Sequence, residues 1–83
     1  MEKAEFVKTI LDGFLKEIPV QRLAYNIPVP EDSKIDTAIQ ELADKYGNPD
    51  TVENIREAVK KEWKEALMYK VSALRFTPRG VAG

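Results

Sequence analysis

One stretch of the chain, residues 51–76, contains neither glycine nor proline. Because these two residues interrupt helices most strongly, their absence predicts one continuous helix of about 38 Å at 1.5 Å per residue. Charged residues are dense up to Glu65, and Glu57 and Lys61 are in the favourable order for an i,i+4 pair. The remainder of the chain has to pack around this long C-terminal helix.

The start of this helix has two equally good interpretations. Asn48 followed by Pro49 suits an N-cap with proline at the first helical position. Asp50 with Glu53 three residues later suits a capping arrangement that begins two residues further on. Both place negative charge in the first turn, where the helix dipole favours it.

Apolar side chains recur along the helix at spacings of three and four. One seam is Val52, Ile55, Val59, Ala66, Tyr69, Ala73 and Phe76, and the other is Val59, Trp63, Leu67, Val71 and Leu74. Two seams imply two neighbouring elements. Residues 71–77 alternate loosely, which leaves a short strand as an alternative, although nothing breaks the helix before them.

The first predicted helix covers residues 2–17. Its apolar residues follow the helical period and form a broad core face made of Phe6, Val7, Ile10, Leu11, Phe14, Leu15 and Ile18. Gly13 weakens a helix relative to alanine, and we interpret it as the mark of a close contact between helices.

A second helix is predicted from about Ser33 to Tyr46, with Asp36 completing a capping box and Gly47 ending the helix in a left-handed conformation. Between the two helices, Pro19, Pro28 and Pro30 exclude continuous helix. This connection is also apolar, so we expect it to be ordered and to lie across the bundle.

The fold prediction is therefore an all-α three-helix bundle with a long C-terminal helix and an ordered, proline-containing connection between helices one and two. Its 83 residues suffice for one domain. We assign residues 1–76 to that domain and residues 77–83, which contain Pro78 and two glycines, to a flexible tail.

Composition argues against several classes of function. The chain has no histidine and no cysteine, so the usual ligands of zinc, haem and iron–sulfur clusters are missing, as is the commonest general base. We expect no enzyme, cofactor, metal site or small-molecule substrate. No uninterrupted apolar run suggests a membrane span, and we expect a cytoplasmic protein.

Length suggests a protein partner or a homo-oligomer. The two shorter helices, at about 24 and 20 Å, do not cover the long one. Its last turns must then be covered by the connection, by staggered helices or by another molecule. The predicted partner-binding residues are Trp63, Leu67, Met68, Tyr69, Leu74, Arg75 and Phe76.

Nucleic-acid binding is the alternative function. Its candidate residues form a basic row made of Arg56, Lys60, Lys61 and Lys64. Glutamates interrupt this row, and the whole chain has a net charge of −1. Residues 31–50 carry a net charge of −4 and residues 51–83 a net charge of +3, so the two segments can also pair with each other.

Overall fold

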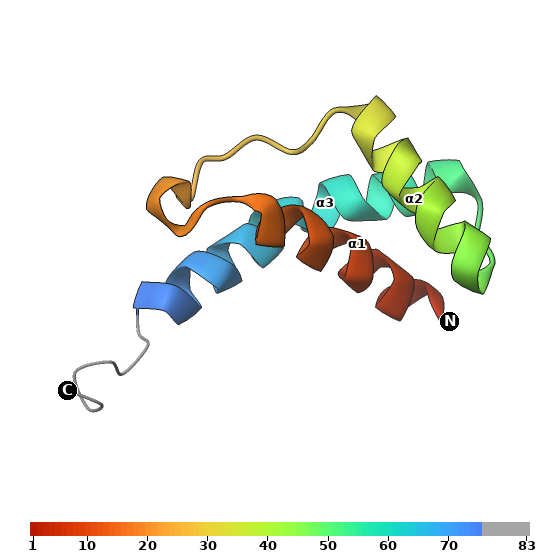
Figure 1. Cartoon of the computed structure of the whole chain (residues 1–83), viewed down its shortest axis with the longest axis horizontal. Coiled ribbons are helices and arrows are strands. Elements are labelled where there is room, and N and C mark those ends of the chain that lie inside the picture. The colour runs from red at the N-terminus through yellow and green to blue at the C-terminus, as the bar shows by residue number, and fades with distance from the viewer. Residues whose placement is uncertain (76–83) are drawn as a thin grey trace.

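The computed structural model describes residues 1–75, and every regular element within them is helical. The elements are α1 (Lys3–Glu17), η1 (Val20–Arg22), α2 (Asp32–Tyr46) and α3 (Val52–Arg75). Each α-helix packs against the other two, which confirms the all-α three-helix bundle (Figure 1). Because α3 is helical as far as Arg75, the strand alternative is wrong for residues 71–75. Phe76 and the predicted tail, residues 77–83, lie outside the described residues.

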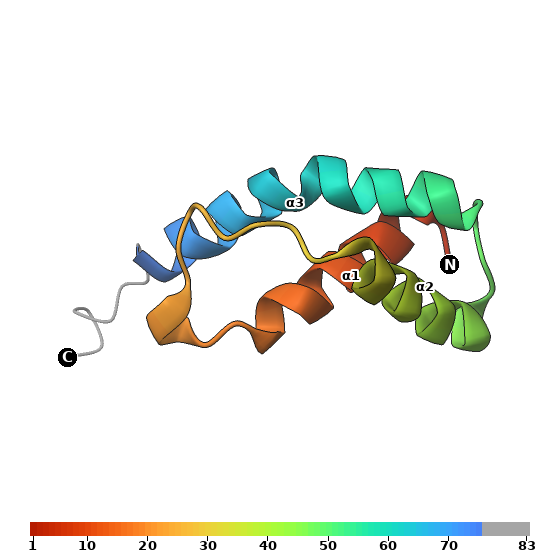
Figure 2. The ribbon, with the colours of Figure 1, turned by 90° about the horizontal axis from the view of Figure 1, so that it is seen from above.

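The helices α1 and α3 run in the same direction, and α2 runs in the opposite direction, from the connection toward the start of α3 (Figure 1). Lys3 Nζ, at the start of α1, lies 3.0 Å from Asp50 Oδ2, just before α3, so the beginnings of both helices are held together. Further along, α1 and α3 diverge (Figure 2). At 1.5 Å per residue α3 spans about 36 Å, against about 22 Å for each of the other two, so its last turns extend past both.

The core is made of one apolar face from each helix. Its buried residues are Phe6, Val7, Ile10, Leu11 and Leu15 of α1, Ile35 and Ile39 of α2, and Ile55, Val59, Trp63, Leu67 and Val71 of α3. The buried face of α3 thus follows one predicted seam up to Val59 and the other seam after it. The expectation of two covered seams is wrong for the second half of α3, where Tyr69 and Ala73 are exposed.

The connection between α1 and α2 occupies the side on which α1 and α3 separate (Figure 2). Apart from the single turn η1 it has no regular structure, as its three prolines require. Leu23, Ile27 and Val29 are partly buried against the core. The predicted ordered connection across the bundle is therefore confirmed.

The helix caps differ in detail from those predicted. Thr51 caps α3, because its Oγ1 accepts a hydrogen bond of 3.1 Å from the backbone N–H of Asn54. The alternatives based on Asn48 and Asp50 are both wrong, and Asp50 instead accepts a hydrogen bond of 2.7 Å from the N–H of Thr51. Local sequence did not distinguish Asn48, Asp50 and Thr51, which all make good caps and lie within four positions.

The second helix also begins before its predicted cap. It starts at Asp32, so Ser33 is already helical and the proposed capping box with Asp36 is wrong. Asp36 is used in an ion pair with α3 instead. At the other end Gly47 has φ 81° and ψ 158°. The φ is positive as predicted, but the ψ is extended, so the left-handed helical conformation is wrong and Gly47 lies in another region that is essentially restricted to glycine.

Candidate partner-binding surface

Two of the predicted partner-binding residues lie in the core. Trp63 is 4 % exposed and Leu67 is 1 % exposed, so neither contributes to a surface that a partner can reach. The connection covers this face of α3, and the indole N–H of Trp63 donates a hydrogen bond of 2.9 Å to the carbonyl oxygen of Ile27. Of the three ways to cover the long helix, the structure therefore uses the connection on this face.

Three other predicted residues are exposed on the last turns of α3. Tyr69 is 78 % exposed, Met68 is 46 % exposed and Leu74 is 40 % exposed. Successive helical residues are about 100° apart, so Met68 and Tyr69 point in different directions. Leu74 lies seven residues, or about two turns, after Leu67 and therefore on the same side of the helix. It is exposed because it lies past the elements that cover Leu67. We call Met68, Tyr69 and Leu74 the apolar end of α3.

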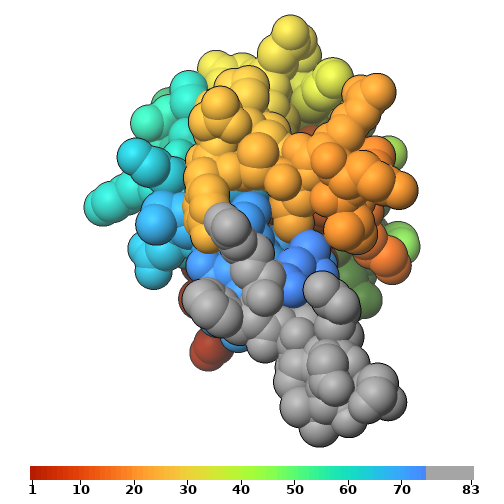
Figure 3. All heavy atoms as spheres, turned by 90° about the vertical axis from the view of Figure 1, so that its left-hand side faces the viewer, coloured from red at the N-terminus to blue at the C-terminus, as the bar shows by residue number. Residues whose placement is uncertain are grey.

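The turn η1 carries a further exposed apolar side chain. This is Val20, which is strongly exposed, and η1 lies at the same end of the molecule as the last turns of α3 (Figures 1 and 3). Arg75, also a predicted partner-binding residue, ends α3, but its side chain lies outside the described part of the chain, as does Phe76.

The predicted basic row divides into two pairs of residues. Arg56 makes two hydrogen bonds to the carboxylate of Asp36, with Nε–Oδ1 at 2.8 Å and Nη2–Oδ2 at 3.0 Å. Lys60 Nζ lies 3.2 Å from Oδ1 of Asp32. Both of these bases therefore hold α3 against α2, which is where the acidic middle segment and the basic C-terminal segment meet.

The pKa values of Arg56 and Asp36 both shift in the direction that favours the charged form. The hydrogen bond from Arg56, followed by its positive charge, holds the pKa of Asp36 below its ordinary value. The hydrogen bond to Asp36 and its negative charge raise the pKa of Arg56. The other two residues of the row, Lys61 and Lys64, are exposed, and neither makes an ion pair among residues 1–74.

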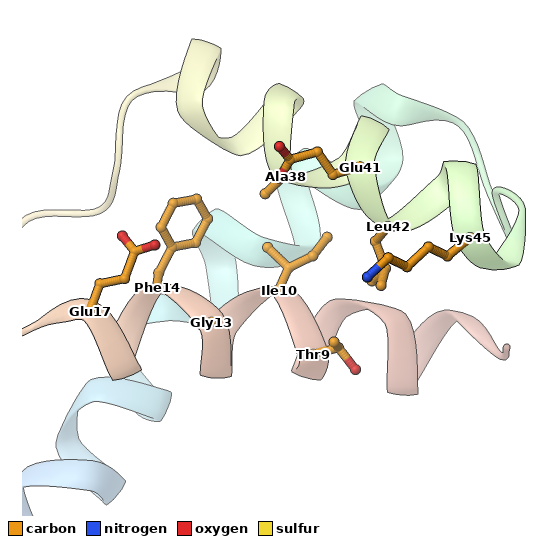
Figure 4. Close-up of a pocket in the computed structure, with 9 residues that line it drawn as sticks. All are labelled: Thr9, Ile10, Gly13, Phe14, Glu17, Ala38, Glu41, Leu42 and Lys45. Atoms are coloured by element: carbon orange, nitrogen blue, oxygen red, sulfur yellow. The ribbon is translucent and has the colours of Figure 1, made fainter.

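A groove that the sequence did not reveal lies between α1 and α2 (Figure 4). It has a volume of about 260 Å³. Apolar side chains line it from both helices, namely Ile10, Phe14, Ala38 and Leu42, and charged ones lie along it, namely Glu17, Glu41 and Lys45. We call it the α1–α2 groove.

Gly13 also lines the α1–α2 groove. A Cβ atom added to Gly13 would meet no heavy atom within 4 Å. The interpretation of Gly13 as a close helix contact is therefore wrong, because the glycine faces open space. In the sequence this glycine indicated a close helix contact, which is the opposite of the groove that the structure shows.

The described helices carry neither a metal-binding cluster nor a membrane-spanning segment. Among residues 1–74, no group of three or more His, Cys, Asp or Glu side chains is arranged to hold a metal ion. In the same part of the chain, no helix combines the length and the apolar character that a membrane span requires.

Comparisons with protein-family models, curated proteins and solved structures found no match to this chain.

Proposed function

We propose that this chain is a small, non-enzymatic protein–protein interaction module that binds a partner protein, or a second copy of itself, through the apolar end of α3. The observation that carries the proposal is the exposure of Met68, Tyr69 and Leu74 on a helix that extends past both of its companions. A helix with apolar side chains on several sides is normally covered on those sides. A partner would supply that cover.

The chemistry of these side chains suits an interface. Tyrosine and methionine are enriched in interface cores, and tyrosine is among the residues that most often dominate binding energy. Because Met68 and Leu74 are already about half buried, burying the rest of each would contribute on the order of 1 kcal/mol before the losses of association are subtracted. Val20 of η1, at the same end of the molecule, is a further exposed apolar side chain.

The first experiment measures the mass of the protein in solution. Sedimentation equilibrium is run on the wild type, on Tyr69→Glu and on Tyr46→Glu as a matched control, since Tyr46 is 57 % exposed on α2. For self-association, the wild type and Tyr46→Glu form oligomers at high concentration and Tyr69→Glu stays monomeric. A wild type that stays monomeric at every concentration removes the homo-oligomeric form of the proposal.

The second experiment tests a different protein as partner. Tagged wild type, Met68→Glu, Tyr69→Glu and the Tyr46→Glu control are used to capture proteins from an extract of the native host. A true partner is recovered with the wild type and the control and is lost with both α3 variants. If Met68→Glu and Tyr69→Glu retain the partners of the wild type, the interface is wrongly placed.

We propose that the module works in the cytoplasm, because a chain without cysteine suits a reducing compartment.

Nucleic-acid binding remains the alternative function, although fewer basic side chains are available for it than the four of the predicted row. Arg56 and Lys60 would have to give up their carboxylates on α2, which leaves Lys61 and Lys64 as the exposed bases of the row. This alternative would be supported if the wild type is retained on heparin or duplex DNA at low salt and the double variant Lys61→Glu with Lys64→Glu is not. No retention at low salt would eliminate it.

A further inference from the structure

The connection between α1 and α2, residues 18–31, contributes no fully buried side chain to the core. The buried residues of the described chain all belong to α1, α2 and α3. Leu23, Ile27 and Val29 of the connection are only partly buried against them. Segments with few buried apolar contacts are the ones that open locally while the rest of a protein stays folded.

The backbone of the connection is also weakly attached. Within residues 1–74, no backbone–backbone hydrogen bond joins residues 19–30 to any of the three α-helices. The two hydrogen bonds of η1 close inside the turn itself, from Arg22 to Pro19 and from Leu23 to Val20. The hydrogen bond from the indole N–H of Trp63 links this backbone to α3. Breaking it frees the indole without breaking any backbone bond of a helix.

A hollow lies beside the point where Trp63 holds the connection. It has a volume of about 470 Å³, and its lining includes Phe14 of α1, Ile27 and Pro28 of the connection, and Trp63 of α3. Side chains that border such a space have fewer packing partners than side chains in a filled core. The connection is therefore incompletely packed where it meets α3.

The three helices are held to one another without the connection. Each of them packs directly against the other two. Two ion pairs join α3 to α2, and Lys3 with Asp50 joins the start of α1 to the start of α3. We propose that the connection is a strap that opens as a unit while α1, α2 and α3 stay packed, and that its opening uncovers Trp63.

Opening changes the surface that continues into the apolar end of α3. Leu67 follows Trp63 by about one turn, and the exposed Leu74 follows Leu67 by about two turns on the same side of the helix. The open form thus presents a longer apolar side of α3 than the closed form. Exposure of the indole opposes opening, so the closed form predominates. The opening goes beyond the proposed function and does not depend on it, because no partner takes part in it.

Hydrogen exchange of the Trp63 indole N–H reports the opening directly. This proton is bonded to the connection, and the chain has one tryptophan, so nitrogen–proton spectra of the labelled protein identify its signal. After correction for intrinsic rates, we expect the indole N–H to exchange about tenfold or more faster than the backbone N–H groups of Val59 and Trp63. Its rate should also depend less on urea, because opening exposes less surface than unfolding. An indole with the same rate and urea dependence as those backbone groups would overturn the proposal.

Three variants distinguish opening of the strap from global unfolding and from rotation of the indole ring alone. Leu23→Ala removes an apolar contact that only the closed form makes, so it should speed exchange of the indole N–H about tenfold. Val20→Ala is the matched control on the same connection, because Val20 is 68 % exposed, and it should change this rate by less than about twofold. Ile39→Val alters a core contact that both forms keep, so it should speed exchange of the Val59 backbone N–H and leave the indole rate unchanged.

Two results with these variants would contradict the proposal. An indole rate that rises in Ile39→Val would mean that the proton exchanges through global unfolding. An indole rate that stays unchanged in Leu23→Ala would mean that the ring moves while the connection stays in place. Either result overturns the strap, and neither bears on whether the apolar end of α3 binds a partner.

Discussion

The indole N–H of Trp63 donates a hydrogen bond of 2.9 Å to the carbonyl oxygen of Ile27, which lies 36 residues earlier in the chain. This bond joins the middle of α3 to the irregular connection between α1 and α2. It satisfies a polar atom on each partner in a partly buried position. The contact ties the connection to the face of α3 that it covers.

Trp63→Phe should destabilise the protein by about 1–3 kcal/mol, because the carbonyl of Ile27 loses its donor and the smaller ring leaves space in the core. Urea denaturation followed by circular dichroism measures the change. The control Tyr46→Phe alters an exposed ring and should stay within about 0.5 kcal/mol of the wild type. Equal stability of Trp63→Phe and the wild type would mean that the connection does not depend on this bond.

The two glycines of the helical region should respond to alanine with opposite signs. Gly13→Ala should raise the free energy of unfolding by up to about 1 kcal/mol, because the helix gains propensity and the new methyl group meets nothing. Gly47→Ala should lower it by about 1–3 kcal/mol, because Gly47 has φ 81° with ψ 158°. Urea denaturation of both variants measures the difference, and the same sign in both would contradict the assigned backbone geometry.

Loss of the Arg56–Asp36 contact should loosen the packing of α2 on α3. Asp36→Asn removes one charge and the bidentate geometry, so it should lower the melting temperature. Asp44→Asn is the matched control, since Asp44 is exposed on the same helix and makes no ion pair among residues 1–74. Arg56→Lys keeps the charge but not the fork, so its melting temperature should fall between those of the wild type and Asp36→Asn. Equal melting temperatures of Asp36→Asn and Asp44→Asn would show that the pair adds nothing.

Acid should weaken the junction before α3. The pKa of Asp50 is lowered to about 2, first by the hydrogen bond from the Asn54 side chain, then by the Thr51 N–H and by Lys3. A carboxyl group with a lowered folded-state pKa stabilises the fold above its unfolded pKa of 3.8 and loses this effect as pH falls through 2. Asp50→Asn should therefore be less stable than the wild type at pH 7.

The difference between Asp50→Asn and the wild type should shrink steadily between about pH 4 and pH 2, as thermal melts across this range would show. Glu41→Gln serves as the control, because Glu41 is exposed and makes no ion pair among residues 1–74. A gap between Asp50→Asn and the wild type that stays constant down to pH 2 would contradict the assigned cause.

The helices and most of their buried faces follow from local patterns. The spacing of Phe6, Ile10 and Ile39, and the run without glycine or proline before Arg75, require no knowledge of neighbours. The caps were less predictable. Asp50 and Thr51 are both good cap residues, and Thr51 takes the role while Asp50 binds Lys3.

The candidate surface was only partly predictable, because spacing along a helix gives the direction of a side chain and not what covers it. Trp63 and Tyr69 both belong to apolar seams of α3, yet one is buried under the connection and the other is 78 % exposed. The α1–α2 groove depends on how two helices are spaced, to which the sequence gave no clue, because Gly13 indicated a close helix contact instead.

That this chain forms three helices, one of them much longer than the others, follows from local sequence, because apolar periodicity and the positions of glycine and proline act within a few residues. The packing of the helices sets which turns of α3 are covered, that Arg56 and Lys60 pair with Asp36 and Asp32, and that Glu17 and Glu41 line one groove. These outcomes depend on contacts between residues far apart in the chain. Such contacts are set by the relative placement of whole helices, which no local pattern records.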